Sequence, residues 1–246
     1  MVARRIPSSS PCVTAMHIAA FFDIDHTLIT ADSGLLFVKY LIRRGAMKRR
    51  ELLGPLYYNI LYRLNLLDIN AVFRRYQGWV RGQEHVAMER LCNEWYSAVV
   101  RPAISAEMAA KVAEHRQTGH VVAILSSATT YVAEPLAREL GIEHLLVNRL
   151  IVAEGKLTGE AVQPLCWGPG KPYWAQRFAA ERGVDLRRSY FYTDAISDLP
   201  MLELVGHPRP VNPDRLLRRH AHRQGWPIVN LGVTPPHAQE ALRDRS

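Results

Sequence analysis

The chain has 246 residues, of which 48% are hydrophobic and 22% charged, and its formal net charge is +8. This composition excludes a disordered or fibrous protein and allows one large domain, or a core with a smaller insert. The three cysteines are odd in number and lack CxxC spacing. That pattern excludes a disulfide framework and favours a reducing compartment.

The two ends of the chain are expected to be flexible tails. Residues 1–15 are polar and contain no apolar run of secretory-signal type. Residues 232–246 are polar and contain prolines. No segment reaches the ~18 consecutive apolar residues that a membrane span requires. The sequence therefore predicts a soluble, cytoplasmic protein.

Short apolar runs alternate with helical periodicity over most of the chain. The predicted strands are His17–Ile24, His120–Leu125, Leu145–Val147, Ser189–Thr193, a stretch around Val211, and Pro227–Leu231. The predicted helices are Ser105–Thr118, Tyr131–Leu140, Pro172–Arg182, Leu199–Val205 and Pro213–Gln224. This alternation is typical of an α/β protein with a doubly wound parallel sheet. Residues 16–31 and 101–231 form the predicted core, and Ala153–Gly159 predicts a hairpin turn.

The interval 32–100 interrupts this alternation. It contains no clear strand, and its apolar residues are spaced three and four apart, which predicts a helical cap inserted in the core. Within it, Leu52–Leu67 is rich in Leu and Tyr and has arginine pairs on both sides. Such a stretch is typical of the interior of a helical bundle, and also of a helix that lies on a membrane surface.

The strongest chemical signal is Asp23-Ile-Asp25-His-Thr27, directly after the first predicted strand. Ligands of open α/β sheets bind at the carboxyl ends of the strands. Two carboxylates placed there, two positions apart, can act on one substrate as nucleophile and as acid and base. A carboxylate nucleophile forms an acyl phosphate that water can cleave.

Further polar residues follow the later strands. Ser126 follows His120–Leu125, and its hydroxyl and the next backbone N–H groups are expected to hold a phosphoryl oxygen at a helix N-terminus. Lys171 opens a helix and can offset phosphoryl charge. Asp194 and Asp198 follow Ser189–Thr193, and carboxylate oxygens suit Mg²⁺. Each residue also has a purely structural interpretation: Ser126 and Asp198 as helix caps, Lys171 as a surface charge.

These motifs, in this order, resemble the haloacid dehalogenase superfamily and its phosphoserine-phosphatase-like branch with a helical cap. The resemblance extends from Ala19 to about Leu231. It implies a magnesium-dependent phosphatase in which Asp23 attacks phosphorus, and Asp25 protonates the leaving oxygen and then deprotonates water. It implies these further roles: metal binding by Asp23, Asp25 (through its backbone carbonyl) and Asp194; phosphate or substrate binding by Thr27, Ser126, Ser127 and Lys171; and support by Asp198.

Two positions bear on the substrate. His26 stands where this family often has a small residue, and it is either a titrating group at the mouth of the site or a packed loop residue. Asp32 lies nine residues after Asp23, where phosphoserine phosphatases have an acid that helps to bind the substrate amine. It therefore favours a phosphoserine-like substrate, although it can equally cap a helix that begins at Ser33.

The predicted function is hydrolysis of a small, polar, soluble phosphomonoester. One alternative is a lipid-phosphate phosphatase at the membrane surface, suggested by Leu52–Leu67. The other is a non-catalytic basic binding protein, suggested by the net charge. The complete set of motif residues argues against the second alternative. We expect no nucleic-acid partner and do not favour peripheral membrane contact. No feature of the sequence indicates an oligomeric state.

Overall fold

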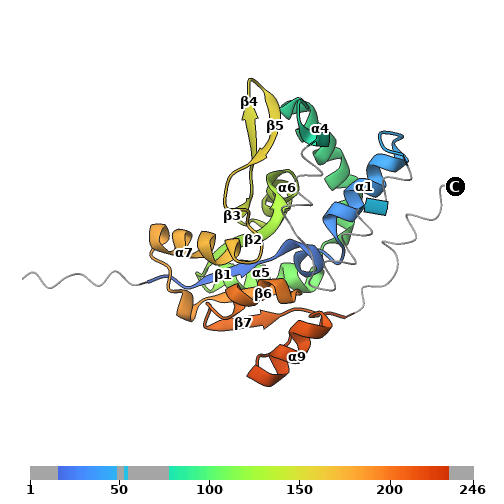
Figure 1. Ribbon diagram of the computed structural model, residues 1–246. Helices are drawn as coiled ribbons and strands as arrows, with labels where there is room; N and C mark the ends of the chain where they lie inside the picture. Colours follow the sequence, from blue (N-terminus) through green and yellow to red (C-terminus); the bar gives the residue numbers. More distant parts are fainter. Residues whose placement is uncertain (1–15, 49–52, 55–77, 233–246) are drawn as a thin grey trace, which may run out of the picture.

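A five-stranded parallel sheet forms the centre of the computed structural model, which describes residues 16–48, 53–54 and 78–232 (Figure 1). Its strands are β1 (Ala19–Phe22), β2 (Val121–Thr129), β3 (His144–Asn148), β6 (Tyr190–Thr193) and β7 (His207–Pro210). They lie in the order β3-β2-β1-β6-β7, and all neighbours run parallel. The predicted α/β fold class is confirmed.

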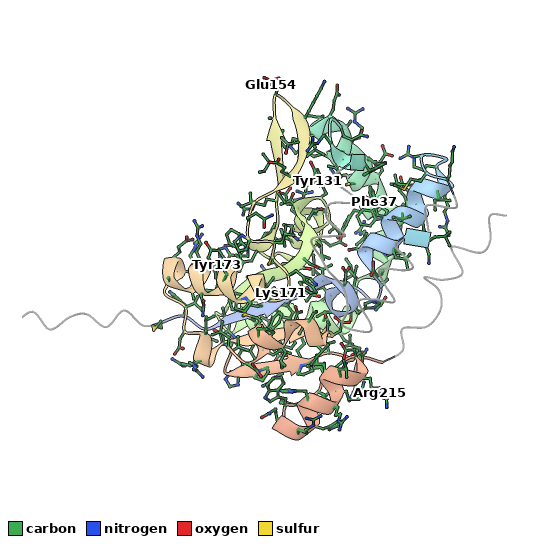
Figure 2. The ribbon with its side chains drawn as sticks, in the orientation of Figure 1. Phe37, Tyr131, Glu154, Lys171, Tyr173 and Arg215 are labelled. Carbon is green, nitrogen blue, oxygen red and sulfur yellow. The ribbon has the colours of Figure 1, made fainter. Side chains whose placement is uncertain are left out.

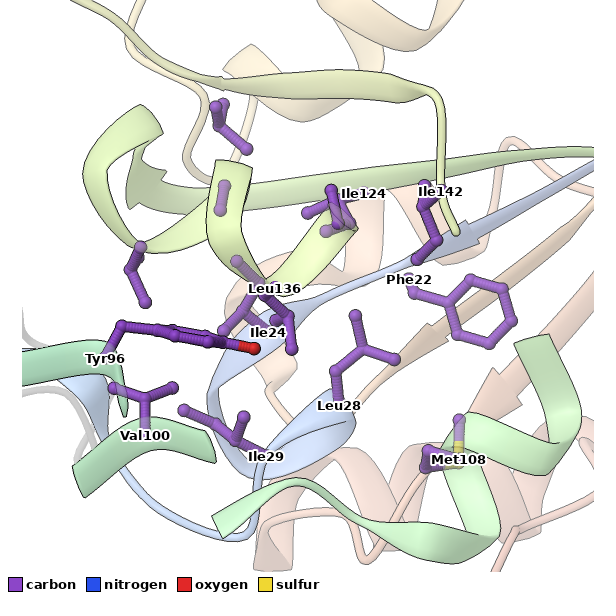
Figure 3. Packing of buried hydrophobic residues seen from close by; sticks show 14 of the residues in the cluster. Phe22, Ile24, Leu28, Ile29, Tyr96, Val100, Met108, Ile124, Leu136 and Ile142 are labelled. Carbon is purple, nitrogen blue, oxygen red and sulfur yellow. The ribbon is translucent and has the colours of Figure 1, made fainter. Parts of the chain in front are cut away.

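Strand β1 is central because all four of its residues are apolar and can be buried on both faces. Ala20 and Phe22 point into one core, and Ala19 and Phe21 into the other; none has any exposed surface. Figure 3 shows Phe22 packed in the first core, with Leu28 and Met108 nearby. Full burial of one such phenylalanine side chain contributes about 1.5–3 kcal/mol.

Helices cover both faces of the sheet. The first core contains residues of α4 (His85–Trp95), α5 (Ala106–Gln117) and α6 (Thr130–Leu140). The second contains residues of α7 (Gly170–Arg182), α8 (Leu199–Leu202) and α9 (Arg215–Gln224). Short helical turns, η1 (Ile24–Leu28), η3 (Tyr96–Val100), η4 (Arg101–Ala103), η5 (Leu186–Arg188) and η6 (Ile196–Asp198), connect these elements. Helices α6 and α7 end at the left-handed residues Gly141 and Gly183, as glycine allows.

The structure corrects two of the predicted elements. The predicted strand Pro227–Leu231 forms only one bridge, between Val229 and Val211. Strand β7 is an edge strand whose residues 208 and 210 are prolines without an N–H donor, so extended pairing along it is not possible. The predicted helix Leu199–Val205 ends at Leu202.

The predicted hairpin is present, and it contacts the region of the predicted cap. Strands β4 (Leu150–Ala153) and β5 (Lys156–Ala161) pair antiparallel around Glu154 and Gly155, which both have positive φ. Residue 84 forms an antiparallel bridge to residue 156, and the N–H of Gly82 donates to the carbonyl of Leu157 at 2.8 Å. A bridge therefore forms within an interval that was expected to be helical throughout.

Helices α1 (Ser33–Arg43) and α4 lie in the predicted cap interval. The cap boundaries at 32 and 100 remain predictions. The tail 1–15, nearly all of the tail 232–246, and all of Leu52–Leu67 except residues 53 and 54 lie outside the described residues. No helix in the described part of the chain is long and apolar enough to cross a membrane.

A buried histidine lies between α5 and the sheet. His115 contacts His120 through their Nδ1 atoms at 2.7 Å and the hydroxyl of Tyr192 through Nε2 at 2.9 Å. Burial, followed by the charge of His120, lowers the pKa of His115 from 6.5 to about 4, although Glu114 acts in the opposite direction. The folded protein therefore binds fewer protons at this position than the unfolded chain does between pH 6.5 and 4.

We predict that His115 makes the folded state less stable as the pH falls. The pKa of His115 is lower in the folded state, so stability is lost as the pH drops below about 6.5. Between pH 7 and 5, this histidine alone should reduce the free energy of unfolding by about 2 kcal/mol. Urea unfolding at both pH values should show a smaller loss for His115→Gln than for wild type. The exposed control His222→Gln should keep the wild-type loss; equal losses in all three proteins would contradict the prediction.

Candidate active site

The predicted site residues meet at one edge of the sheet. Asp23 follows β1, Asp194 follows β6, and Ser126 lies in β2. Strand β1 pairs with both β2 and β6, and the N–H of Asp23 donates to the carbonyl of Tyr192 at 2.9 Å. The carboxyl ends of these strands therefore bring together residues that are more than 100 positions apart in the sequence.

Lys171 connects two of the carboxylates. Its Nζ donates to Asp23 Oδ1 at 2.9 Å and to Asp198 Oδ2 at 2.7 Å, and only 2% of the residue is exposed. Figure 2 shows Lys171 near the centre of the molecule, where α7 meets the sheet. Helix α7 starts one residue earlier, at Gly170, where an added Cβ would lie 1.8 Å from the carbonyl oxygen of Leu165. Glycine therefore permits the close approach that places the lysine.

The charges around Lys171 support each other. Burial lowers the pKa of Lys171, but the carboxylates of Asp198 and Asp23 more than offset this effect, so that its pKa is raised and it remains an ammonium. Burial also raises the pKa of Asp198, while Lys171 and a hydrogen bond from Thr193 oppose that shift. The structure thus places the carboxylate of Asp198 against Lys171, one of the two groups, with metal-bound water, that the family resemblance expects Asp198 to orient.

Asp25 has a different environment. Its Oδ1 accepts a hydrogen bond from the backbone N–H of Ser33 at 2.8 Å. Desolvation, followed by the carboxylates of Asp32 and Asp23, raises the pKa of Asp25 from 3.8 to about 8. The chain turns away after Asp25 because His26 has a left-handed backbone with φ of 52°. This shift favours the protonated form of Asp25 at neutral pH, which is the form that a general acid needs.

The carboxylates have the properties of a site for a divalent cation. Asp194 Oδ1 is buried and accepts no hydrogen bond from any described residue. Burial, followed by the carboxylates of Asp23 and Asp198, raises the pKa of Asp194 well above 3.8. No group of three or more His, Cys, Asp or Glu side chains forms a metal site in the described ranges. Two carboxylates, those of Asp23 and Asp194, with the backbone carbonyl of Asp25 would still suit Mg²⁺, which keeps several waters and binds substrate phosphate.

Ser126 is positioned differently from the prediction. It lies inside β2, which continues to Thr129, so α6 begins four residues after it and not directly beside it. The pairing with β3 shifts between Ser126 and Thr129, and this irregularity lets the strand continue. Ser126 is 1% exposed, and its Oγ accepts from the N–H of Ala128 at 3.3 Å. Ser127 is half-buried beside it.

The structure also shows the surroundings of Thr27 and Asp32, the two remaining residues predicted to bind phosphate or substrate. Thr27 is fully buried, and its hydroxyl oxygen has no hydrogen-bond partner among the described residues. Asp32 caps α1, since its Oδ1 accepts from the N–H of Leu35 at 2.7 Å. Its carboxylate is also close enough to raise the pKa of Asp25. The capping role and a position beside the reacting groups are therefore compatible.

This geometry agrees with the comparison to known protein families. The model of the haloacid dehalogenase-like hydrolases matches residues 20–203, which span Asp23, Ser126, Lys171 and Asp194. The chain belongs to this family. The resemblance predicted from the motifs is thus confirmed, and so is the prediction that the chain is an enzyme.

Curated relatives of this hydrolase include phosphatases by name. "Probable phosphatase Rv3661" of Mycobacterium tuberculosis is 36% identical over 98% of this chain and 84% of that protein. A "Histidinol-phosphatase" of Neisseria meningitidis is 30% identical over 86% and 98%. "Phosphoserine phosphatase SerB1" of M. tuberculosis is 30% identical over 87% and 71%. A crystal structure of a Bordetella pertussis protein of unknown function has a TM-score of 0.80 and 27% identity, covering 88% and 100%.

Sequence reasoning missed three residues that hold this hydrolase site together. The Oδ2 atom of Asp214 accepts a hydrogen bond from the N–H of Ile196, in the loop of residues 194–198 that follows β6. The hydroxyl of Thr193 donates to Asp198 in the same loop. Asn148 is buried; its Nδ2 donates to the carbonyl of Ser127 at 2.7 Å, and its Oδ1 accepts from the N–H of Cys166 at 2.8 Å. Thr193 ends one predicted strand and Asn148 directly follows another. A polar residue at the carboxyl end of a strand was therefore the sequence signal that could have identified both.

We predict that Asn148 positions Ser126 and Ser127, the two serines that the sequence predicts to bind phosphate. Asn148→Asp replaces the amide donor by a second acceptor facing the carbonyl of Ser127, so the β2 end should shift. The expected result is at least a tenfold loss of kcat/KM, with weaker inhibition by vanadate, because the loss of one buried hydrogen bond costs about 1–3 kcal/mol. Asn93→Asp, on the exposed side of α4, serves as the control. Lower thermal stability with unchanged vanadate affinity would show a purely structural role.

Proposed function

We propose that this phosphatase hydrolyses a small, polar, amine-bearing phosphomonoester through a phosphoaspartate on Asp23. The observation that carries the proposal is the contact of the Lys171 ammonium with Asp23 and Asp198. Asp25, two residues after Asp23, has a raised pKa that favours its protonated form. A carboxylate nucleophile and a neutral carboxylic acid thus lie side by side at the strand ends. Their environments differ, as acid and nucleophile require.

In the first step, a carboxylate oxygen of Asp23 attacks phosphorus, and the bond from phosphorus to the substrate oxygen breaks. Asp25 donates its proton to that oxygen, so the product leaves as a neutral alcohol. In the second step, Asp25, now ionised, removes a proton from a water molecule that attacks phosphorus. The bond to Asp23 then breaks, which releases inorganic phosphate and restores both carboxyl groups.

The other residues stabilise the phosphoryl group. Lys171 already contacts Asp23, so its positive charge lies beside the transferring group in both steps. Ser126 offers a buried hydroxyl, and Asp198 keeps Lys171 in place. Mg²⁺, when bound to Asp23, Asp194 and the carbonyl of Asp25, would offset the negative charge shared by nucleophile and phosphate. The buried Oδ1 of Asp194, which has no hydrogen-bond partner among the described residues, supports this placement.

The nucleophile and the metal can be tested separately. Asp23→Asn should reduce hydrolysis of an aryl phosphate by at least about 10³-fold, because an amide cannot attack phosphorus. Wild-type protein should also require Mg²⁺ and melt at a higher temperature when Mg²⁺ is added, because ligands stabilise the state they bind. Asp194→Asn should lose this thermal shift, whereas the exposed control Glu160→Gln should keep both properties. Activity that survives excess chelator and Asp23→Asn would refute the mechanism.

The amine preference is supported by Asp32 and by two relatives. Phosphoserine and histidinol phosphate, the substrates in the names of two relatives, are both phosphates of a primary alcohol with an amine on the next carbon. Asp32 lies at the start of α1, near Asp25. Its negative charge beside the reacting carboxyl groups favours a substrate that carries an ammonium. A buried acyl chain would instead be disfavoured by this charge.

The substrate class can be tested without disturbing the helix cap. Asparagine caps helices as well as aspartate does. Asp32→Asn should therefore keep the fold but reduce kcat/KM for phosphoserine and histidinol phosphate by about tenfold, or ~1.4 kcal/mol. The loss for glycerol 3-phosphate, which lacks the amine, should be smaller, because this substrate loses only the effect of Asp32 on the pKa of Asp25. An equal loss on all substrates, or a tenfold preference of wild type for a lysophosphatidate, would contradict the assignment and favour the lipid-phosphate alternative.

A further inference from the structure

Helix α9 carries an unusual concentration of positive charge. Its ten residues include Arg215, Arg218, Arg219 and Arg223 and two histidines, and none is acidic. Half of the net charge of +8 therefore lies on one helix. Leu217 and Ala221 are fully buried against the sheet, and this fixes which face of the helix points outward.

The outward face of α9 is exposed, and its arginines have no ion-pair partner in the described part of the chain. All four arginines are exposed, and none forms an ion pair with any residue in the described ranges. Some exposed arginines elsewhere are ion-paired, as Arg44 is with Glu94, Arg101 with Glu139 and Arg177 with Glu181, whereas others, such as Arg187 and Arg188, have no ion pair among the described residues. Glu203 lies 4.0 Å from His220 of α9, but no described carboxylate pairs with the four arginines. What distinguishes α9 is therefore the concentration of unpaired arginines on one face.

The shape and composition of this face indicate the kind of partner. Helix α9 lies at the outer end of the molecule, beyond edge strand β7 and opposite the β4–β5 hairpin (Figure 1). Figure 2 shows Arg215 at this periphery. Leu216 lies among the arginines with 46% of its surface exposed. A protruding face that combines arginines with an exposed leucine suits a lipid surface, whereas the phosphates of a nucleic acid gain little from an apolar side chain.

We propose that the α9 face binds the surface of an anionic phospholipid membrane. The arginines contact headgroup phosphates and Leu216 enters the interface, while the catalytic core stays in water. Asp214 caps α9, and it also accepts from Ile196 and donates its N–H to the carbonyl of Asp194. Binding through α9 therefore holds the loop of residues 194–198, which follows β6, next to the membrane. The proposal does not depend on which phosphomonoester is cleaved.

Vesicle flotation tests the proposal. The full chain should bind vesicles of 70% phosphatidylcholine and 30% phosphatidylglycerol at 50 mM NaCl, and not vesicles of phosphatidylcholine alone. Each arginine near an anionic surface is worth about fivefold in affinity, so Arg219→Gln/Arg223→Gln should bind roughly 25-fold more weakly. Arg44→Gln/Arg177→Gln removes the same charge from ion-paired positions and should bind like wild type. Leu216→Ser should also weaken vesicle binding.

Every other outcome counts against the membrane assignment. No binding at 50 mM NaCl, or equal binding to neutral vesicles, overturns it. Equal losses in the two arginine variants would mean that overall charge, and not α9, is responsible. Tighter, α9-dependent binding to a DNA duplex at the same salt concentration would assign the face to nucleic acid. Aryl phosphate hydrolysis by all variants should equal that of wild type, which shows that the fold is intact and separates this test from that of the catalytic mechanism.

Discussion

The buried ammonium of Lys171 is the interaction on which the site depends. A lysine that is 2% exposed is stable in its charged form only if nearby anions replace the water it has lost. Asp23 and Asp198 provide those anions, and Asp198 also accepts from Thr193. Removing one partner of such a buried pair costs about 3–5 kcal/mol. Asp23 is thus held by the same contact that keeps the lysine charged.

This contact constrains the rest of the fold. Asp23 lies after the central strand β1, Lys171 lies at the start of α7, and Asp198 lies between β6 and α8. The ammonium can reach both carboxylates only if α7 packs closely on the sheet, and Gly170 allows that approach. Packing of α7 and α8 around Phe21 and Phe191 supplies the apolar burial that holds these segments together. Stability of the core and geometry of the site therefore come from the same packing.

The region between residues 78 and 100 is held to the core by several contacts. Residues 82–85 pair with residues 155–157 of the hairpin. His85 contacts the hydroxyl of Tyr131 at 2.8 Å, and Tyr96 and Arg101 both donate to Glu139 of α6. These polar contacts, at the ends of α4 and the turns after it, add to the apolar packing of Trp95 in the first core. Helix α4 is thus fixed to α6 and to the hairpin, and it also contacts α1 through the rings of Phe37 and Trp95.

The sequence by itself determined the class of sheet and pointed to the residues that meet at its strand ends. Strong periodicity and strand-end carboxylates are local signals, so β1, β6, Asp23, Asp25 and Asp194 could be singled out from the sequence alone. The tertiary structure decided the continuation of β2 past Ser126, the single bridge at Val229, the raised pKa of Asp25 and the hydrogen bonds of Asn148. Each of these features depends on where segments that are distant in the sequence meet. Strand β2 continues because it pairs with β3, and the bridge at Val229 stays single because the edge strand β7 contains prolines. The pKa of Asp25 depends on the carboxylates around it, and the side chain of Asn148 links the backbones of Ser127 and Cys166. Local sequence patterns do not record such contacts, because hydrogen bonding and desolvation depend on which groups meet in space.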